Sequence, residues 1–147
     1  MRTVLDTAVL VAAIRSNKGA SRQLVRDALE NRFELLLSVP LVLEYEAVLK
    51  RPEHLKASGG TASDIDKLLD ALIAMAKPVH RAFFWRPLLR DANDDMVLEA
   101  AMSGHSDSIV TFNRRDFEPA ASQLGIAIVS PQEALGEIRR IGVHRSN

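Results

Sequence analysis

The sequence predicts an α/β protein in which helices cover both faces of a central, mostly parallel sheet. Two observations carry this prediction: short apolar segments recur along the chain, and segments with helical spacing of apolar residues separate them. Strands that alternate with helices favour parallel pairing, because each helix returns the chain to the start of the next strand. Ligands of such sheets bind beyond the carboxyl ends of the strands, where Asp6 and Asn113 are expected.

Five apolar segments are short enough to be core strands, because a buried strand needs far fewer residues than a helix. The predicted strands are residues 2–5, 33–39, 79–85, 108–111 and 126–129, of which 79–85 is either a strand or an extended segment. The segments between them predict helices from apolar periodicity. The predicted helices are residues 8–14, 21–32, 40–51, 64–75, 94–102 and 131–140, with a loop and a short helix in 113–123.

Start and stop signals support several of these helices. Pro40 suits a first helical turn, and the segment 130–133 has the serine, proline and glutamate of a capping box. Ser63 is the expected cap of the helix that follows it, and Asn93 or Asp94 is the expected cap of the next one. Residues 52–63 are expected to form a loop, and Gly104 is expected to end a helix.

Composition predicts a single domain over residues 1–141, with a polar C-terminal tail at 142–147. The 147 residues contain 47% hydrophobic and 26% charged residues, which is ordinary for a globular protein. Nineteen basic residues balance nineteen acidic ones, so a polyanion would have to be held by a local basic patch. The absence of cysteine excludes disulfide scaffolds, thiolate metal sites and cysteine nucleophiles.

The apolar N-terminal stretch is interpreted as a buried strand rather than as a signal peptide. Asp6 lies inside it, and no cleavage signature follows. No stretch approaches the roughly 20 apolar residues that a membrane-spanning helix needs. We therefore expect no membrane association and a cytoplasmic location.

Acidic and polar residues recur at the ends of the predicted elements. Asp6 ends the first strand, Glu44 lies one turn into a helix, and the clusters at 91–95 and 111–116 carry further acids. Mg²⁺ and Mn²⁺ prefer such oxygen ligands. A bound metal lowers the pKa of water and orients it for attack on a phosphodiester. The pattern therefore predicts a metal-dependent hydrolase.

Each acid also has a structural interpretation. Asp6 is in a position to cap the following helix, and Glu44 taken alone is typical of a solvated side chain. Asp94 and Asp95 compete as helix caps, so their spacing does not choose between them. Asp116 has Arg114 or Arg115 as an ordinary surface partner.

Other residue clusters are weaker candidates. The four histidines show no metal-ligand spacing, and Gly59 and Gly60 lack the lysine and helix of a phosphate-binding loop. Aromatic residues at 83–85 are more typical of a core or an interface than of base stacking. Three arginines flank them, so a basic-aromatic edge beside the acidic cluster is an alternative interpretation: Arg81, Arg86 and Arg90.

Four segments taken together resemble the PIN-domain family, especially the ribonuclease toxins of toxin–antitoxin pairs. They are residues 4–11, 38–49, 91–101 and 109–117, in the order that the family shows, and they span nearly the whole chain. The resemblance implies a PIN-like three-layer α/β/α sandwich with a central, mostly parallel sheet. It also implies a divalent-metal-dependent endoribonuclease with Mg²⁺ or Mn²⁺.

The resemblance assigns roles to individual residues and favours Asp95 over Asp94. The implied catalytic acids are Asp6, Glu44, Asp95 and Asp116. The implied metal ligands are these four and Asn113. The implied substrate contacts are Thr7, Thr111, Arg114 and Arg115. Two positions depart from the family pattern: Ala8 stands where many relatives carry asparagine, and Asn113 where many carry aspartate, which removes one negative charge.

The resemblance further implies an RNA substrate, a cognate antitoxin protein as partner, and a homodimer. Two other hypotheses share the fold or the metal chemistry. One is a catalytically degenerate PIN-fold interaction module that uses the acidic pocket for binding only. The other is a phosphatase or nucleotide hydrolase, which would turn over small phosphate esters but not RNA.

Overall fold

One parallel sheet organises the computed structural model of the chain, which describes residues 1–80 and 88–146. The strands found in these residues are β1 Arg2–Leu5, β2 Glu34–Leu37, β3 Lys77–Pro78, β4 Ser108–Val110 and β5 Ala127–Val129. Their order across the sheet is β3-β2-β1-β4-β5, and every pairing is parallel. The α/β fold with a central parallel sheet is confirmed.

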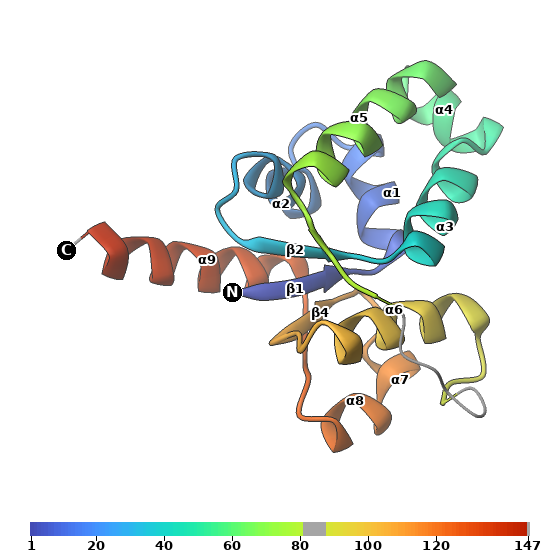
Figure 1. The fold of residues 1–147 in the computed structure, drawn as a ribbon. Helices are drawn as coiled ribbons and strands as arrows, with labels where there is room; N and C mark the ends of the chain where they lie inside the picture. The colour runs from blue at the N-terminus through green and yellow to red at the C-terminus, as the bar shows by residue number, and fades with distance from the viewer. Residues whose placement is uncertain (81–87, 147) are drawn as a thin grey trace.

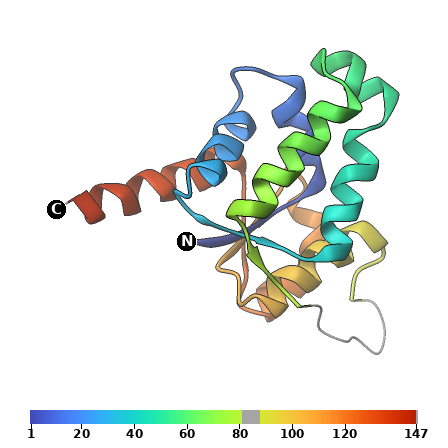
Figure 2. The same ribbon diagram turned by 45° about the horizontal axis from the view of Figure 1, so that its top comes forward.

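Helices lie on both sides of this sheet. They are α1 Thr7–Arg15, α2 Ala20–Leu29, α3 Val39–Leu49, α4 Pro52–Ser58, α5 Ala62–Met75, α6 Ala92–Ser103, α7 Arg114–Phe117, α8 Ala120–Gln123 and α9 Pro131–Ser146. In Figure 1, α1, α2, α4 and α5 lie above the strands, whereas α6, α7 and α8 lie below them. The C-terminal part of α9 projects beyond the sheet, as Figure 2 also shows.

Strand register places two distant residues side by side at the carboxyl edge of the sheet. Leu5 on β1 pairs with Val110 on β4, and the N–H of Asp6 donates to the carbonyl of Val110 at 2.9 Å. Asp6 and Thr111, each the first residue after its strand, are therefore neighbours. The sequence placed Asp6 at a strand end correctly because the apolar run stops there.

The core is continuous across the sheet. Fully buried side chains come from central strands and from the helices packed on them, including Leu36, Leu98, Ile109 and Phe117. Burying one such side chain contributes about 1.5–3 kcal/mol relative to leaving it in water. Gly104, the predicted helix stop, follows α6 and lies against this core: a Cβ added there would come within 2.7 Å of Leu36 Cδ1.

The expected loop at 52–63 is largely helical. Arg51 and Pro52 begin α4, and Gly59 ends it in the left-handed conformation, with φ of 74°. Proline is compatible with a first helical turn, so it separates α3 from α4 without breaking helical structure beyond it. The cap of α5 is Thr61 rather than Ser63, because Thr61 and Asp64 form a reciprocal capping box.

The cap of α6 also differs from the prediction. Asp91 caps this helix, since its Oδ1 accepts the N–H groups of Asn93 at 2.7 Å and Asp94 at 3.3 Å. Neither Asn93 nor Asp94 has the predicted capping role. The side chain of Asp94 is consequently available for other interactions.

Three further predictions concern the last strands and the C-terminus. The third strand is Lys77–Pro78, and the N–H of Val79 donates to Leu37 O at 2.9 Å, whereas residues 81–85 of the predicted strand lie outside the described residues. The capping box at 130–133 is confirmed by reciprocal bonds of 3.0 and 3.1 Å. The helix it begins was expected to end near Arg140, but α9 continues to Ser146, so residues 142–146 of the predicted tail are helical. None of the helices in the described ranges has the length and apolar character needed to cross a membrane.

Candidate functional site

Asp6 is buried at the junction of β1 and α1. Its side chain makes no capping hydrogen bond to α1; instead, Oδ2 accepts the hydroxyl of Thr111 at 2.7 Å. That hydroxyl in turn accepts the N–H of Asn113 at 3.0 Å. The carboxylate is therefore oriented from β4 and from the turn that follows it.

Burial and neighbouring charge oppose the ionisation of Asp6. Burial raises the pKa of this carboxyl, and the negative charges of Asp116 and Asp91 raise it further. The hydrogen bonds from Thr111 and from the backbone of Thr7 lower the pKa but only partly offset the burial. The protein thus holds a carboxylate in a position where its charge is costly.

Asp94 shares this environment. It lies half-buried in the first turn of α6, and its pKa is raised to about 6, first by burial and then by the charges of Asp6, Asp91 and Asp116. We call these four residues, Asp6, Asp91, Asp94 and Asp116, the acid group. They come from three places in the chain and are brought together by the β1–β4 pairing and by the start of α6.

Asp95 has a different contact. Its Oδ1 accepts the N–H of Leu88 at 3.1 Å and of Leu89 at 3.0 Å, so it holds the segment that leads into α6. Successive residues of an α-helix point about 100° apart, and so Asp94 and Asp95 face different surroundings. The sequence analysis favoured Asp95, but the structure brings Asp94 to the other acids.

Glu44 lies half-buried on α3, and it is not among the charges that act on Asp6 or Asp94. Its neighbour Tyr45 joins α3 to the site. The buried Tyr45 hydroxyl donates to Leu5 O at 2.5 Å, and burial together with the charge of Asp6 raises the pKa of this phenol well above its ordinary value. Sequence reasoning missed Tyr45, although a single tyrosine within an apolar helical run was a usable signal.

The remaining predicted residues occupy distinct positions. Asn113 is exposed and precedes α7, where its side chain makes no capping hydrogen bond. Thr7 is buried, and its hydroxyl has no hydrogen-bond partner among the described residues. Arg114 lies on the outer side of α7, with Nη2 3.7 Å from Glu133 Oε1.

An open depression of about 570 Å³ lies beside the acid group and is lined by three of its four members. Asp91, Asp94 and Asp116 line it together with two arginines, Arg90 and Arg115. The segment before α6 and the start of α8 form its other walls. A ligand in this depression would therefore meet carboxylates and guanidinium groups at once.

The donor chemistry of the acid group fits a divalent cation. Within residues 1–80 and 88–146, no three His, Asp or Glu side chains stand close enough to enclose an ion by themselves. Mg²⁺, however, usually takes only one or two carboxylates and completes its shell with water and substrate oxygens. A cation would also relieve the repulsion that raises the pKa of Asp6 and Asp94.

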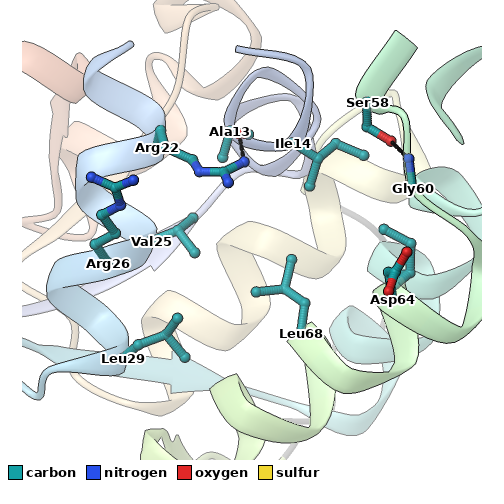
Figure 3. A pocket seen from close by; sticks show the side chains of 11 residues that line it. Ala13, Ile14, Arg22, Val25, Arg26, Leu29, Ser58, Gly60, Asp64 and Leu68 are labelled. Atoms are coloured by element: carbon teal, nitrogen blue, oxygen red, sulfur yellow. Dashed lines mark hydrogen bonds between the residues drawn. The ribbon is translucent and has the colours of Figure 1, made fainter. Parts of the chain in front are cut away.

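A second cleft, of about 380 Å³, lies between α2 and α5. Figure 3 shows apolar side chains such as Val25 and Leu68 directed into it, with Arg22 donating to the carbonyl of Ala13 at 3.1 Å. Its single acid, Asp64, is already engaged in the capping box with Thr61. The cleft lies about two turns of α1 from Asp6 and lacks a set of groups for metal or acid–base chemistry.

Comparison with known proteins gives one family match. The sequence model of the family described as PIN domain matches residues 2–115. The matched segment runs from β1 to the start of α7 and ends one residue before Asp116. No curated protein matches the chain.

Proposed function

Because the chain belongs to the PIN-domain family, whose members are generally nucleases, we propose that it is a divalent-metal-dependent endoribonuclease that hydrolyses RNA phosphodiester bonds. The observation that carries the proposal is the mutual influence of Asp6, Asp91, Asp94 and Asp116 at the carboxyl edge of the sheet. Carboxylates on flexible surface side chains would move apart, because their negative charges repel one another. Here the fold holds the four aspartates near one another. Such an arrangement is typical of a site that binds cations.

We assign Asp6 and Asp94 as the principal ligands of Mg²⁺ or Mn²⁺, with Asp116 and Asn113 at the outer side of the site. When bound, the metal supplies a water of lowered pKa and stabilises charge on the leaving oxygen. Thr111 orients Asp6, and the open depression lets a chain enter. Asp95 is assigned to hold the segment before α6, and Glu44 stays a predicted ligand that no described contact supports.

We further propose that the protein is the toxin of a toxin–antitoxin pair that acts on RNA in the cytoplasm and is inhibited by a cognate antitoxin protein. A homodimer is part of this proposal. Three exposed apolar side chains that line one groove between the start of α3 and the end of α5 support it: Val39, Leu43 and Ile73. Apolar groups gathered in this way usually mark an interface.

The decisive experiment is an RNA cleavage assay with the purified chain. Single-stranded RNA is incubated with Mg²⁺ or Mn²⁺, with chelator, and with the Asp6→Asn and Asp94→Asn variants. Metal-dependent cleavage that both variants lose supports the proposal. Turnover of small phosphate esters without RNA cleavage would instead indicate a phosphatase.

One observation favours a second candidate, the non-catalytic interaction module. Asn113 gives the site a neutral amide and so reduces the charge available for a metal. If this candidate is correct, the chain binds RNA or a protein partner but leaves RNA intact in Mg²⁺ and in Mn²⁺. Calorimetry with each metal alone would then show whether the pocket still binds a cation.

A further inference from the structure

We propose that Arg90 and Arg115 form a phosphate-binding subsite beside the acid group, which holds the backbone of a single-stranded nucleic acid. The inference rests on the proposed function for its substrate class. It adds the residues that receive the chain and separates them from those that surround the metal. Both Arg114 and Arg115 are predicted substrate contacts. The inference assigns only Arg115 to this subsite.

The two arginines reach one depression from different elements. Arg90 immediately precedes Asp91, the cap of α6, whereas Arg115 lies in α7. Both are exposed, and both line the depression of about 570 Å³ that Asp91, Asp94 and Asp116 also line. Two cations on separate supports can hold consecutive phosphates, which a single flexible cation cannot.

Among the described residues, no carboxylate forms an ion pair with either guanidinium. In the part of the chain that the structure describes, ion pairs involve Arg2, Arg32, Arg114 and Arg140, but not Arg90 or Arg115. The charges that act on Asp94 are those of other acids. The arginines therefore do not neutralise the acid group, and their donors remain available. A planar guanidinium binds phosphate oxygens through two parallel hydrogen bonds.

Charge balance explains why the subsite is needed. A phosphodiester that approaches four aspartates is repelled, and the chain as a whole is neutral, with 19 basic and 19 acidic residues. Attraction must therefore come from cations in the same depression. Among the residues that the structure describes, Arg90 and Arg115 are the cations that line it.

The test measures binding without catalysis. A fluorescein-labelled single-stranded RNA is titrated with the full chain in chelator, and anisotropy gives Kd at several salt concentrations. We expect Arg90→Gln and Arg115→Gln each to weaken binding about tenfold and to reduce the salt dependence of log K by about 0.7, the value for one phosphate contact in a single strand. Arg90→Lys and Arg115→Lys should keep the salt dependence, since the charge remains.

Arg26→Gln is the matched control, because Arg26 is an exposed arginine on α2 that lines the cleft between α2 and α5 and does not line this depression. It should change Kd by less than about twofold, as expected for a group that makes no phosphate contact. Thermal melts of all variants confirm that they are folded. Wild-type Kd and salt dependence in both glutamine variants would overturn the inference.

Cleavage kinetics separate this inference from the proposed function. If the wild type cleaves RNA and the glutamine variants raise KM with little change in kcat, both stand. If the wild type cleaves but KM is unchanged in the variants, the subsite is wrong and the function stands. If the wild type binds RNA through Arg90 and Arg115 but cleaves nothing in Mg²⁺ or Mn²⁺, the subsite stands and the ribonuclease proposal fails.

Discussion

The hydroxyl of Thr111 donates a 2.7 Å hydrogen bond to Oδ2 of Asp6, although 105 residues separate the two in the chain. The contact exists because β1 and β4 pair in parallel and both end at the same edge. It is one of the few influences that lower the pKa of Asp6. Thr111 therefore links the strand pairing of the sheet to the charge state of Asp6.

Replacing Thr111 with valine should destabilise the protein and weaken metal binding. The variant keeps the shape of the side chain but loses the donor to Asp6 and the acceptor for the Asn113 N–H. A buried hydrogen bond to a charged group contributes about 1.5–3 kcal/mol. We expect the free energy of unfolding, measured in urea, to fall by that amount. Thr111→Ser, the control, should retain most of it, and equal losses in both variants would point to packing instead.

Asp94→Asn and Asp95→Asn should have different consequences. Asp94→Asn removes a charge from the acid group and should abolish metal-dependent RNA cleavage while leaving the fold intact. Asp95→Asn weakens the contacts to the Leu88 and Leu89 N–H groups, so it should loosen the segment before α6 and reduce activity only partly. Full loss in Asp95→Asn with full activity in Asp94→Asn would reverse the assignment of these neighbours.

Without metal, Asp94 should make the protein less stable as pH rises. Its pKa in the folded protein is about 6, above the ordinary 3.8, so its contribution is favourable below about pH 4 and is lost as pH rises through 6. Solvent screening limits the effect to about 1 kcal/mol. We therefore expect Asp94→Asn to melt about 2–4 °C above wild type at pH 7 and no higher at pH 4.

Millimolar Mg²⁺ or Mn²⁺ should remove the difference in Tm between the wild type and Asp94→Asn at pH 7. The metal should raise the Tm of the wild type at pH 7 but not at pH 4. A metal that binds only the folded state stabilises it by mass action. Protonation of Asp94 at pH 4 should remove the effect. A wild-type Tm that is unchanged by either metal at pH 7, with no heat of binding, would argue against a cation site.

Asn113→Asp tests whether position 113 contributes charge to the metal. The change is nearly isosteric, and Asn113 is exposed, so packing is unaffected. If the side chain coordinates, the aspartate should tighten Mn²⁺ binding and raise ribonuclease activity. Unchanged affinity in calorimetry would place position 113 outside the coordination shell and leave Asp116 as the better ligand.

Gly104→Ala should destabilise the fold without involving the site. The added Cβ would lie 2.7 Å from Leu36 Cδ1 and 2.9 Å from Val79 Cγ2. Forcing atoms into a packed core costs about 1–3 kcal/mol. Chemical denaturation measures the loss. Gly136→Ala, in a helix with open space around it, is the control and should be neutral or stabilising.

Sequence reasoning located the sheet because its signal is local. The segments 2–5 and 108–111 predicted strands without knowledge of their partners, and proline or glycine marked the ends of several helices. The helix at 52–58 was missed because Pro52 and the glycines after it suggested a loop. Proline in a first turn and glycine after a last turn are equally consistent with a short helix.

The choice between Asp94 and Asp95 depended on information that is not local. Which of the two faces Asp6 follows from where α6 begins, and that is fixed by Asp91 as its cap rather than by Asn93 or Asp94. A shift of one residue in the start of a helix rotates every side chain by about 100°. Similarly, nothing in the sequence shows that Tyr45 donates to Leu5 O, because this contact joins elements that are folded together only in three dimensions.

The sequence separation of Asp6 and Thr111 also determines when their contact can form during synthesis of the chain. Asp6 is made 105 positions before Thr111, its hydrogen-bond donor. At about 5–20 residues per second, a ribosome needs roughly 5–20 s to close that interval. Until β4 emerges, β1 lacks one of its two neighbouring strands and the acids have not met. A site that needs Asp6 together with the residues around β4 therefore forms only after β4 has been made, and a nascent chain that stops short of β4 lacks it.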